Sequence, residues 1–214
     1  MTKKLSPWIL GFVMPWAMST NLIAHPIAYK GSISLMSMNS RDMNEIYTHY
    51  SFSPRLSLGA KFLRIEERKK ESYSVFPQLS VLLHRWNQEN FQANIYAYGG
   101  FGANKANDKT GTTVFYGGEA DIEDRRFYLS TSFQGLRLSE FRDHHTLKAR
   151  AGVAAYVAEY TEPAVWGIFQ YEWHPGAEMK HQFTPIVRIF YKNALLETGS
   201  SIKGDWLLNF MIHY

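Results

Sequence analysis

The fold is decided by residues 205–214, which read D-W-L-L-N-F-M-I-H-Y. Every second side chain in this stretch is apolar or aromatic: Trp206, Leu208, Phe210, Ile212 and Tyr214. A period of two over ten residues predicts a strand with one apolar face. Ten residues is also the length of a tilted strand that crosses the core of a bilayer. The alternative at this point is the half-buried last strand of a soluble β-sandwich.

This stretch resembles the terminal strand of bacterial outer-membrane β-barrels. In that architecture, an aromatic last residue preceded by alternating apolar residues is a signal for the barrel assembly machinery. The resemblance therefore implies an assembly signal at positions 206, 208, 210, 212 and 214, with the barrel assembly machinery as a partner. It also implies that the protein lies in the outer membrane and contacts outer-membrane lipid. It concerns an architecture and implies no specific functional family and no oligomeric state.

The composition of the chain agrees with a barrel. The 214 residues fit one domain, and aromatic residues make up 15% of them, as expected where aromatic girdles mark two membrane interfaces. Mean hydropathy is only −0.29, because in a barrel only alternate residues face lipid. The absence of cysteine excludes disulfides, thiolate metal sites and a cysteine nucleophile. The modest net charge of +4 does not indicate a nucleic-acid partner.

Residues 1–24 have the pattern of a secretory signal peptide. Lys3 and Lys4 form a charged beginning, Trp8 to Ala17 is a short apolar run, and Leu22 to Ala24 is a cleavage site. Cleavage after Ser19 or Ala28, or an uncleaved inner-membrane anchor, are the alternatives. We therefore expect export through the inner membrane, a signal peptide over 1–24 and a transmembrane barrel over 25–214.

The remainder predicts an all-β, up-and-down antiparallel barrel. Alternating segments bounded by turn residues predict ten or twelve strands, with twelve as the best count. Pro77 is awkward in this scheme, because it removes one backbone donor from the strand predicted over 73–83. The expected strands cover residues 30–39, 46–52, 56–62, 73–83, 91–97, 114–122, 127–133, 147–155, 164–173, 183–191, 195–201 and 205–214.

The predicted connections also alternate in length, which favours a barrel over a sandwich. With both termini in the periplasm, outer-membrane barrels place longer loops outside and short turns inside. The longer and more charged outside set is Glu66–Ser72, Ala103–Gly111, Arg137–His145 and His174–Gln182. The inside set is Ser53–Arg55, Arg85–Asn90, Asp124–Arg125, Ala158–Pro163 and Lys192–Asn193.

Charged residues within the strands are expected to face the lumen, because a charge facing lipid at mid-depth costs about 2–4 kcal/mol. Hairpin geometry would bring Asp121 close to Arg126 across the turn at 124–125. One interpretation is a polar channel whose basic residues attract anionic solutes; the other is a closed network of salt bridges in a narrow barrel. The predicted lumen-lining set is Lys61, Glu119, Asp121, Arg126, Lys148, Arg150, Glu172 and Arg188.

Other chemistry is weakly indicated. The eight histidines show no metal-ligand spacing, so no metal and no cofactor are expected. The outer-membrane phospholipase family carries His and Ser close together in one strand; here the nearest counterpart is His49-Tyr50-Ser51, beside a predicted periplasmic turn. The second hydrolase candidate is Asp143-His144-His145, which would form an acid-base group in a predicted outer loop, as in surface proteases.

The sequence thus predicts a narrow porin-like channel for small hydrophilic solutes, including anionic ones, and no catalytic residues. The alternatives are a closed barrel with a structural or partner-docking role and, third, a barrel hydrolase.

Overall fold

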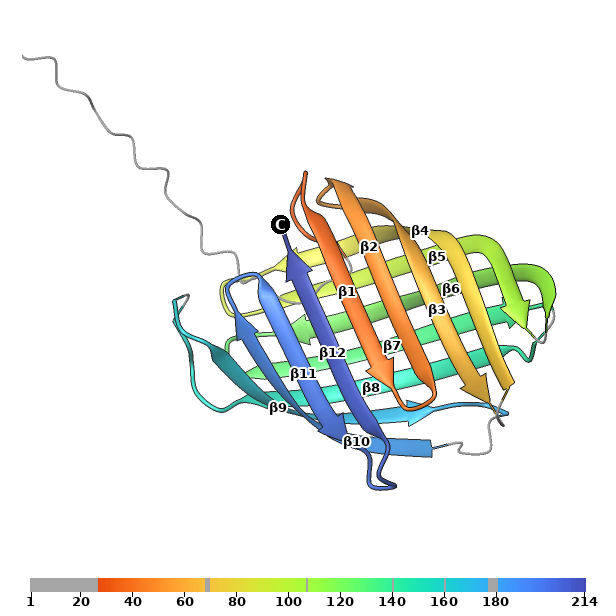
Figure 1. The fold of residues 1–214 in the computed structure, drawn as a ribbon. Helices are drawn as coiled ribbons and strands as arrows, with labels where there is room; N and C mark the ends of the chain where they lie inside the picture. Colours follow the sequence, from red (N-terminus) through yellow and green to blue (C-terminus); the bar gives the residue numbers. More distant parts are fainter. Residues whose placement is uncertain (1–26, 68–69, 107, 140, 160, 177–180) are drawn as a thin grey trace, which may run out of the picture.

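The computed structural model describes residues 27–67, 70–106, 108–139, 141–159, 161–176 and 181–214. Twelve antiparallel strands follow one another around a closed barrel, in which β1 pairs with β12 (Figure 1). The predicted fold class and strand number are therefore confirmed. The segment predicted to be a signal peptide lies outside the described residues, and that assignment stays a prediction.

The strands differ widely in length, from 7 residues in β11 to 18 in β4. Their bounds are β1 Ile33–Ser40, β2 Met43–Ser53, β3 Leu56–Glu67, β4 Lys70–Asn87, β5 Gln92–Ala106, β6 Lys109–Glu123, β7 Phe127–Leu138, β8 His144–Ala154, β9 Ala164–Trp173, β10 His181–Tyr191, β11 Ala194–Ser200 and β12 Trp206–His213.

The closing strand has the two faces that its sequence predicts. In β12, Trp206, Leu208 and Phe210 are exposed on the outside, whereas Asn209 and Met211 are buried inside. The first and last strands of the wall meet at their outer ends, because Ile33 and Tyr214 exchange backbone hydrogen bonds of 2.9 and 2.8 Å. Both ends of the barrel wall therefore lie at one end of the molecule, called here the terminal end; the opposite end is called the distal end.

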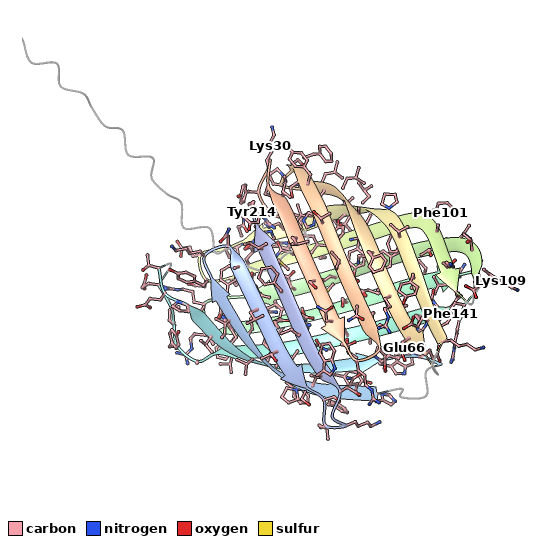
Figure 2. All side chains as sticks on the ribbon, in the orientation of Figure 1. Lys30, Glu66, Phe101, Lys109, Phe141 and Tyr214 are labelled. Carbon is pink, nitrogen blue, oxygen red and sulfur yellow. The ribbon has the colours of Figure 1, made fainter. Side chains whose placement is uncertain are left out.

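The outer surface is apolar and is bordered by aromatic residues at both ends. Exposed Leu58, Leu79 and Val187 are examples of the aliphatic zone. Aromatic residues border it near the terminal end at Tyr50, Phe52, Phe127, Tyr191 and Tyr214, and near the distal end at Phe62, Tyr73, Phe101, Phe133 and Phe183. Figure 2 labels one residue of each group, Tyr214 and Phe101. An apolar zone between two aromatic girdles is the surface of a barrel that spans a membrane. Within the described residues, no helix is long and apolar enough to cross a membrane.

The predicted asymmetry of loop lengths is wrong. Residues 66–72 and 103–111, expected to be outer loops, are mostly strand: β3 and β4 still pair at Glu66 and Glu71, and β5 and β6 at Ala106 and Lys109. Polar side chains beyond the lipid zone do not prevent pairing, because the backbone still gains its hydrogen bonds there. The longest connection, residues 155–163, lies at the terminal end, where short turns were expected.

Pro77 lies within β4 without ending it. The residue pairs with Ala60 of β3, while pairing with β5 passes directly from Val75 to Gln78. Facing this gap is Gly102, where an added Cβ would lie 2.2 Å from the carbonyl oxygen of Val75 and 2.6 Å from the Cβ of Phe76. The absence of a side chain at Gly102 allows the two strands to approach closely here.

The distal half of the lumen holds an apolar cluster along the wall formed by β3 to β7. Met43 and Phe141 pack against it from the rim. Its buried members come from five neighbouring strands and are Leu63, Ile65, Phe76, Tyr98, Phe115, Leu136 and Leu138. This part of the lumen is therefore a packed core and not a wide aqueous bore.

We predict that Gly102→Val destabilises the barrel by about 1–3 kcal/mol, because the new side chain would overlap the backbone of β4. Gly167→Val is the matched control, since the space around Gly167 is open and the position is exposed. The measurement is the denaturant midpoint of the refolded protein in detergent. Equal midpoints for the two variants would contradict the packing described here.

Candidate functional site

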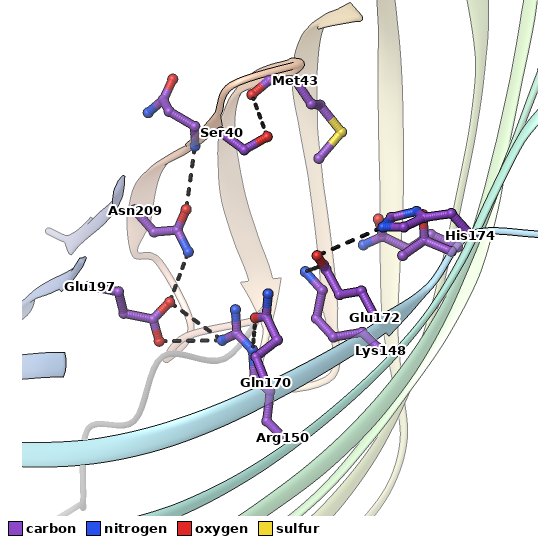
Figure 3. Close-up of polar contacts among 12 residues, drawn as sticks. Ser40, Met43, Lys148, Arg150, Gln170, Glu172, His174, Glu197 and Asn209 are labelled. Atoms are coloured by element: carbon purple, nitrogen blue, oxygen red, sulfur yellow. Dashed lines mark hydrogen bonds and ion pairs between the residues drawn. The ribbon is translucent and has the colours of Figure 1, made fainter. Parts of the chain in front are cut away.

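The middle of the lumen holds a buried cluster of charged residues around Glu197 on β11. The Nε and Nη2 atoms of Arg188, on β10, donate to Glu197 Oε1 at 2.8 and 2.7 Å. Arg150, on β8, approaches the same carboxylate with Nη1 at 3.3 and 3.4 Å. Asn209, on β12, donates to Oε2 at 2.8 Å (Figure 3). Two guanidinium groups thus share one carboxylate.

Further contacts hold the two arginines in place. The guanidinium carbon of Arg188 lies 4.7 Å from the ring centroid of Tyr128, a cation–π distance. Arg150 also donates from Nε to the side-chain oxygen of Gln170 at 2.7 Å. Since a buried ion is tolerated only when it is paired and hydrogen-bonded, these partners explain how three charged side chains coexist inside the barrel.

A second buried ion pair lies on the opposite wall. Lys61 Nζ is 2.8 Å from Glu45 Oε1, and both side chains are almost completely buried. The ammonium also lies 4.3 Å from the ring centroid of Phe115 and 5.3 Å from that of Tyr47. Lys61 therefore lies between the charged middle of the lumen and the apolar cluster of the distal half.

A third group links the middle of the lumen to the distal mouth. Lys148 Nζ is 3.0 Å from Glu172 Oε1, and His174 Nε2 is 3.8 Å from Glu172 Oε2. His174 Nδ1 in turn lies 3.1 Å from the hydroxyl of Thr146. Figure 3 shows Lys148, Glu172 and His174 grouped apart from the Glu197 cluster.

Most of the charged residues predicted to face the lumen do lie on the inner face. The middle cavity is lined by Lys61, Glu119, Lys148, Arg150 and Arg188 among others. Glu172 contacts Lys148, as described. Asp121 is buried and accepts a hydrogen bond of 2.7 Å from Asn94. That these side chains line a path for solutes stays a proposal.

Arg126 is the exception, and its predicted place in the lumen is wrong. The turn between β6 and β7 covers residues 124–126, one residue more than expected, so Arg126 precedes the strand and is exposed. Its backbone N–H donates to the Asp124 carboxylate at 2.6 Å. Asp121 pairs across the hairpin with Ser130 and not with Arg126.

Sequence reasoning missed the acidic partners Glu45 and Glu197. Glu45 lies two residues before Tyr47 and shares its inward phase, but the predicted strand began at Ile46. Glu197 lies between Leu195 and Gly199 in a strand for which no inward face was assigned. Extending the first strand by one residue would have placed Glu45 in the lumen, and assigning Leu195 to the inner face of the second would have placed Glu197 there.

The cavity in the middle of the lumen is small, at about 110 Å³. A water molecule needs about 10–15 Å³ of such volume, so the cavity has room for several waters. Its charged lining contains four cations, Lys61, Lys148, Arg150 and Arg188, and three carboxylates, Glu45, Glu119 and Glu197. Glu172, which is not part of this lining, pairs with Lys148, so the excess of positive charge lies at the two arginines that share Glu197.

The serine and histidine side chains that lie close together in the described lumen are buried. Ser34 Oγ lies 2.6 Å from His213 Nδ1, but Ser34 is completely buried in the wall. His49 and Ser51 are likewise buried, with the His49 ring stacked on Tyr47. In the described part of the chain, no group of three or more His, Asp or Glu side chains is placed to hold a metal ion.

Comparison with known proteins gives likenesses in shape alone. No protein-family model matches the chain, and no curated protein matches it in sequence. The chain is similar in fold to outer-membrane porins. A KdgM porin in complex with disordered oligogalacturonate has 12% identity and a TM-score of 0.49, covering 86% of this chain and 98% of the porin. OccAB4 of Acinetobacter baumannii has 13% identity and a TM-score of 0.42, covering 84% of this chain and 56% of OccAB4.

We predict that Glu197→Ala destabilises the barrel by about 3–5 kcal/mol, because two buried guanidinium groups would lose their shared carboxylate. Glu159→Ala is the control: it also removes an ion-paired carboxylate, but its pair with Arg125 is largely exposed, and the expected change is about 0–1 kcal/mol. Denaturant unfolding in detergent measures both. A loss at Glu197 no larger than that at Glu159 would contradict the assigned role of the cluster.

Proposed function

We propose that this protein is an outer-membrane channel for the passive passage of small hydrophilic solutes. The observation that carries the proposal is the cavity in the middle of a lipid-facing barrel, lined by charged and hydroxyl-bearing side chains from opposite walls. Apolar cores do not need such groups, whereas a path for hydrated solutes does. The expected signal peptide and C-terminal strand support a route through the inner membrane to the barrel assembly machinery and outer-membrane lipid.

The charges around Glu197 support a modest preference for anions. Arg150 and Arg188 share this one carboxylate, so the cluster has one positive charge in excess. In a narrow passage with low-dielectric walls, a single excess charge raises the local concentration of counter-ions. The solutes of the proposed channel therefore include small anions, as the sequence predicts.

A closed barrel with a structural or partner-docking role is the second candidate. It is favoured by the apolar cluster in the distal half of the lumen and by the small volume of the middle cavity. The two candidates differ in whether side chains in the lumen move enough to admit ions. An enzymatic role is not proposed, because Ser34 and His213, which contact each other in the described part of the chain, are both buried and inaccessible to a substrate.

The deciding measurement is the conductance of refolded residues 25–214 in a planar bilayer. A channel gives discrete steps that vary linearly with voltage, and a salt gradient gives a reversal potential that indicates anion preference. Stable insertion with no steps would contradict the channel and support the closed barrel.

We predict that Arg150→Ala abolishes the anion preference, because it leaves Arg188 and Glu197 as one balanced ion pair. The reversal potential under a salt gradient should move toward zero. Arg125→Ala is the control, since it removes the same charge from an exposed turn. An unchanged reversal potential in Arg150→Ala, or an equal shift in both variants, would contradict selectivity at this cavity.

A further inference from the structure

The segment before β1 turns into the barrel at the terminal end. Ile27 is only 2% exposed and packs against Leu82 and Tyr96. These two residues lie on the inner faces of β4 and β5, since their neighbours Leu83 and Ile95 are exposed outside. Ile27 therefore lies within the lumen and contacts a wall that is three to four strands away from β1.

The other end of this segment is fixed to the wall at β2. The backbone N–H of Gly31 donates to the Ser51 carbonyl at 2.8 Å, and that of Ser51 donates to the Ser32 carbonyl at 3.0 Å. The Ser32 hydroxyl closes the turn by donating to the Tyr29 carbonyl at 2.7 Å. Gly31 has φ +87°, a conformation that glycine adopts without strain and that turns the chain inward here.

The length of the segment fits a crossing of the opening. Ile27 and Ile33 are six Cα–Cα steps apart, so the distance between them is at most about 20 Å. Three to four strand spacings along the wall amount to about 14–19 Å. The chain therefore has just enough length to reach from β1 to β4 and β5, and it does so on the lumen side. Figure 2 shows Lys30, which lies within this segment, at the same end of the barrel as Tyr214.

The surface that receives Ile27 is held by polar contacts. Arg85 donates from Nη2 to the Tyr96 hydroxyl at 3.2 Å and from Nε to the Asn94 side-chain oxygen at 2.6 Å. Asn94 in turn donates to Asp121 at 2.7 Å. The Tyr96 ring is thus fixed, and Ile27 covers it at the edge of a polar region of the lumen.

We propose that residues 27–31 form a strap that closes the lumen at the terminal end, and that release of Ile27 from Leu82 and Tyr96 opens it. The strap gives the channel a closed and an open state whose balance depends on the burial of one side chain. The test of this inference by conductance rests on the proposed channel function, whereas the test by cysteine labelling does not.

The first test is the open fraction of single channels in Ile27→Asp. A charged side chain does not remain against Leu82 and Tyr96, so the ratio of open to closed states should rise about tenfold, which is about 1.4 kcal/mol. Ile33→Asp is the matched control: the same substitution lies six residues away at an exposed position of the wall. An open fraction of Ile27→Asp equal to that of the unmodified protein would overturn the strap.

The second test is independent of conductance and uses the absence of native cysteine. A membrane-impermeant maleimide should label Ile27→Cys much more slowly than Tyr29→Cys, because Tyr29 is exposed and Ile27 is buried. Equal labelling rates would overturn the strap even if the barrel does not conduct. Slow labelling at position 27 with no conductance in any variant would refute the channel while supporting the strap.

The third test is the mass of the exported chain, because the strap exists only if Ile27 is retained. Cleavage after Ala24 or Ser19 keeps it, whereas cleavage after Ala28 would remove it and overturn the proposal.

Discussion

Closure of the sheet by the pairing of β1 with β12 is the contact on which the rest of the structure depends. Seven residue pairs, from Ser34–His213 to Ser40–Leu207, join strands at opposite ends of the sequence. In a bilayer there is no water to satisfy an open sheet edge, and each unsatisfied backbone group costs several kcal/mol. The apolar outer face of the barrel is therefore compatible with lipid only because this last pairing leaves no edge.

Closure also creates the inner face, where charged side chains depend on one another. Each strand sends alternate residues inward, so Arg150 on β8 meets the hairpin partners Arg188 and Glu197 of β10 and β11, although it lies far from them in sequence. Removed from bulk water, these groups are stable only as a network. The same burial that makes the network costly to break makes it the strongest electrostatic feature that a passing solute would meet.

A solute that crosses this barrel has to pass the side chains that occupy its lumen. The apolar cluster lies along β3 to β7 in the distal half, ion pairs cross the middle, and Ile27 lies at the terminal end. Each of these is made of side chains, and side chains can move without breaking the backbone pairing of the wall. A rigid wall with a movable filling is a physical basis for a channel that is closed at rest.

The sequence by itself determined the wall and its two faces. Alternation such as that from Trp206 to Phe210 is local, because side chains of a strand point to opposite sides whatever its neighbours are. It therefore predicted the barrel, its twelve strands and the inward direction of Lys61, Arg150 and Arg188. The same reasoning failed at Arg126 and at the hairpins ending near Glu67 and Ala106, because the end of a strand depends on how far its partner continues to pair.

Only the tertiary structure decided which inward residues meet. Arg188 and Glu197 are cross-strand partners in one hairpin, and Glu45 and Lys61 come from another. The contact of Arg150 on β8 with Glu197 on β11 instead depends on register and curvature across several strands, which no local pattern encodes. The place of Ile27 depends on the shape of the opening that the closed sheet leaves. Local periodicity thus determines the direction of each side chain, whereas the contacts inside the lumen follow from closure of the whole sheet.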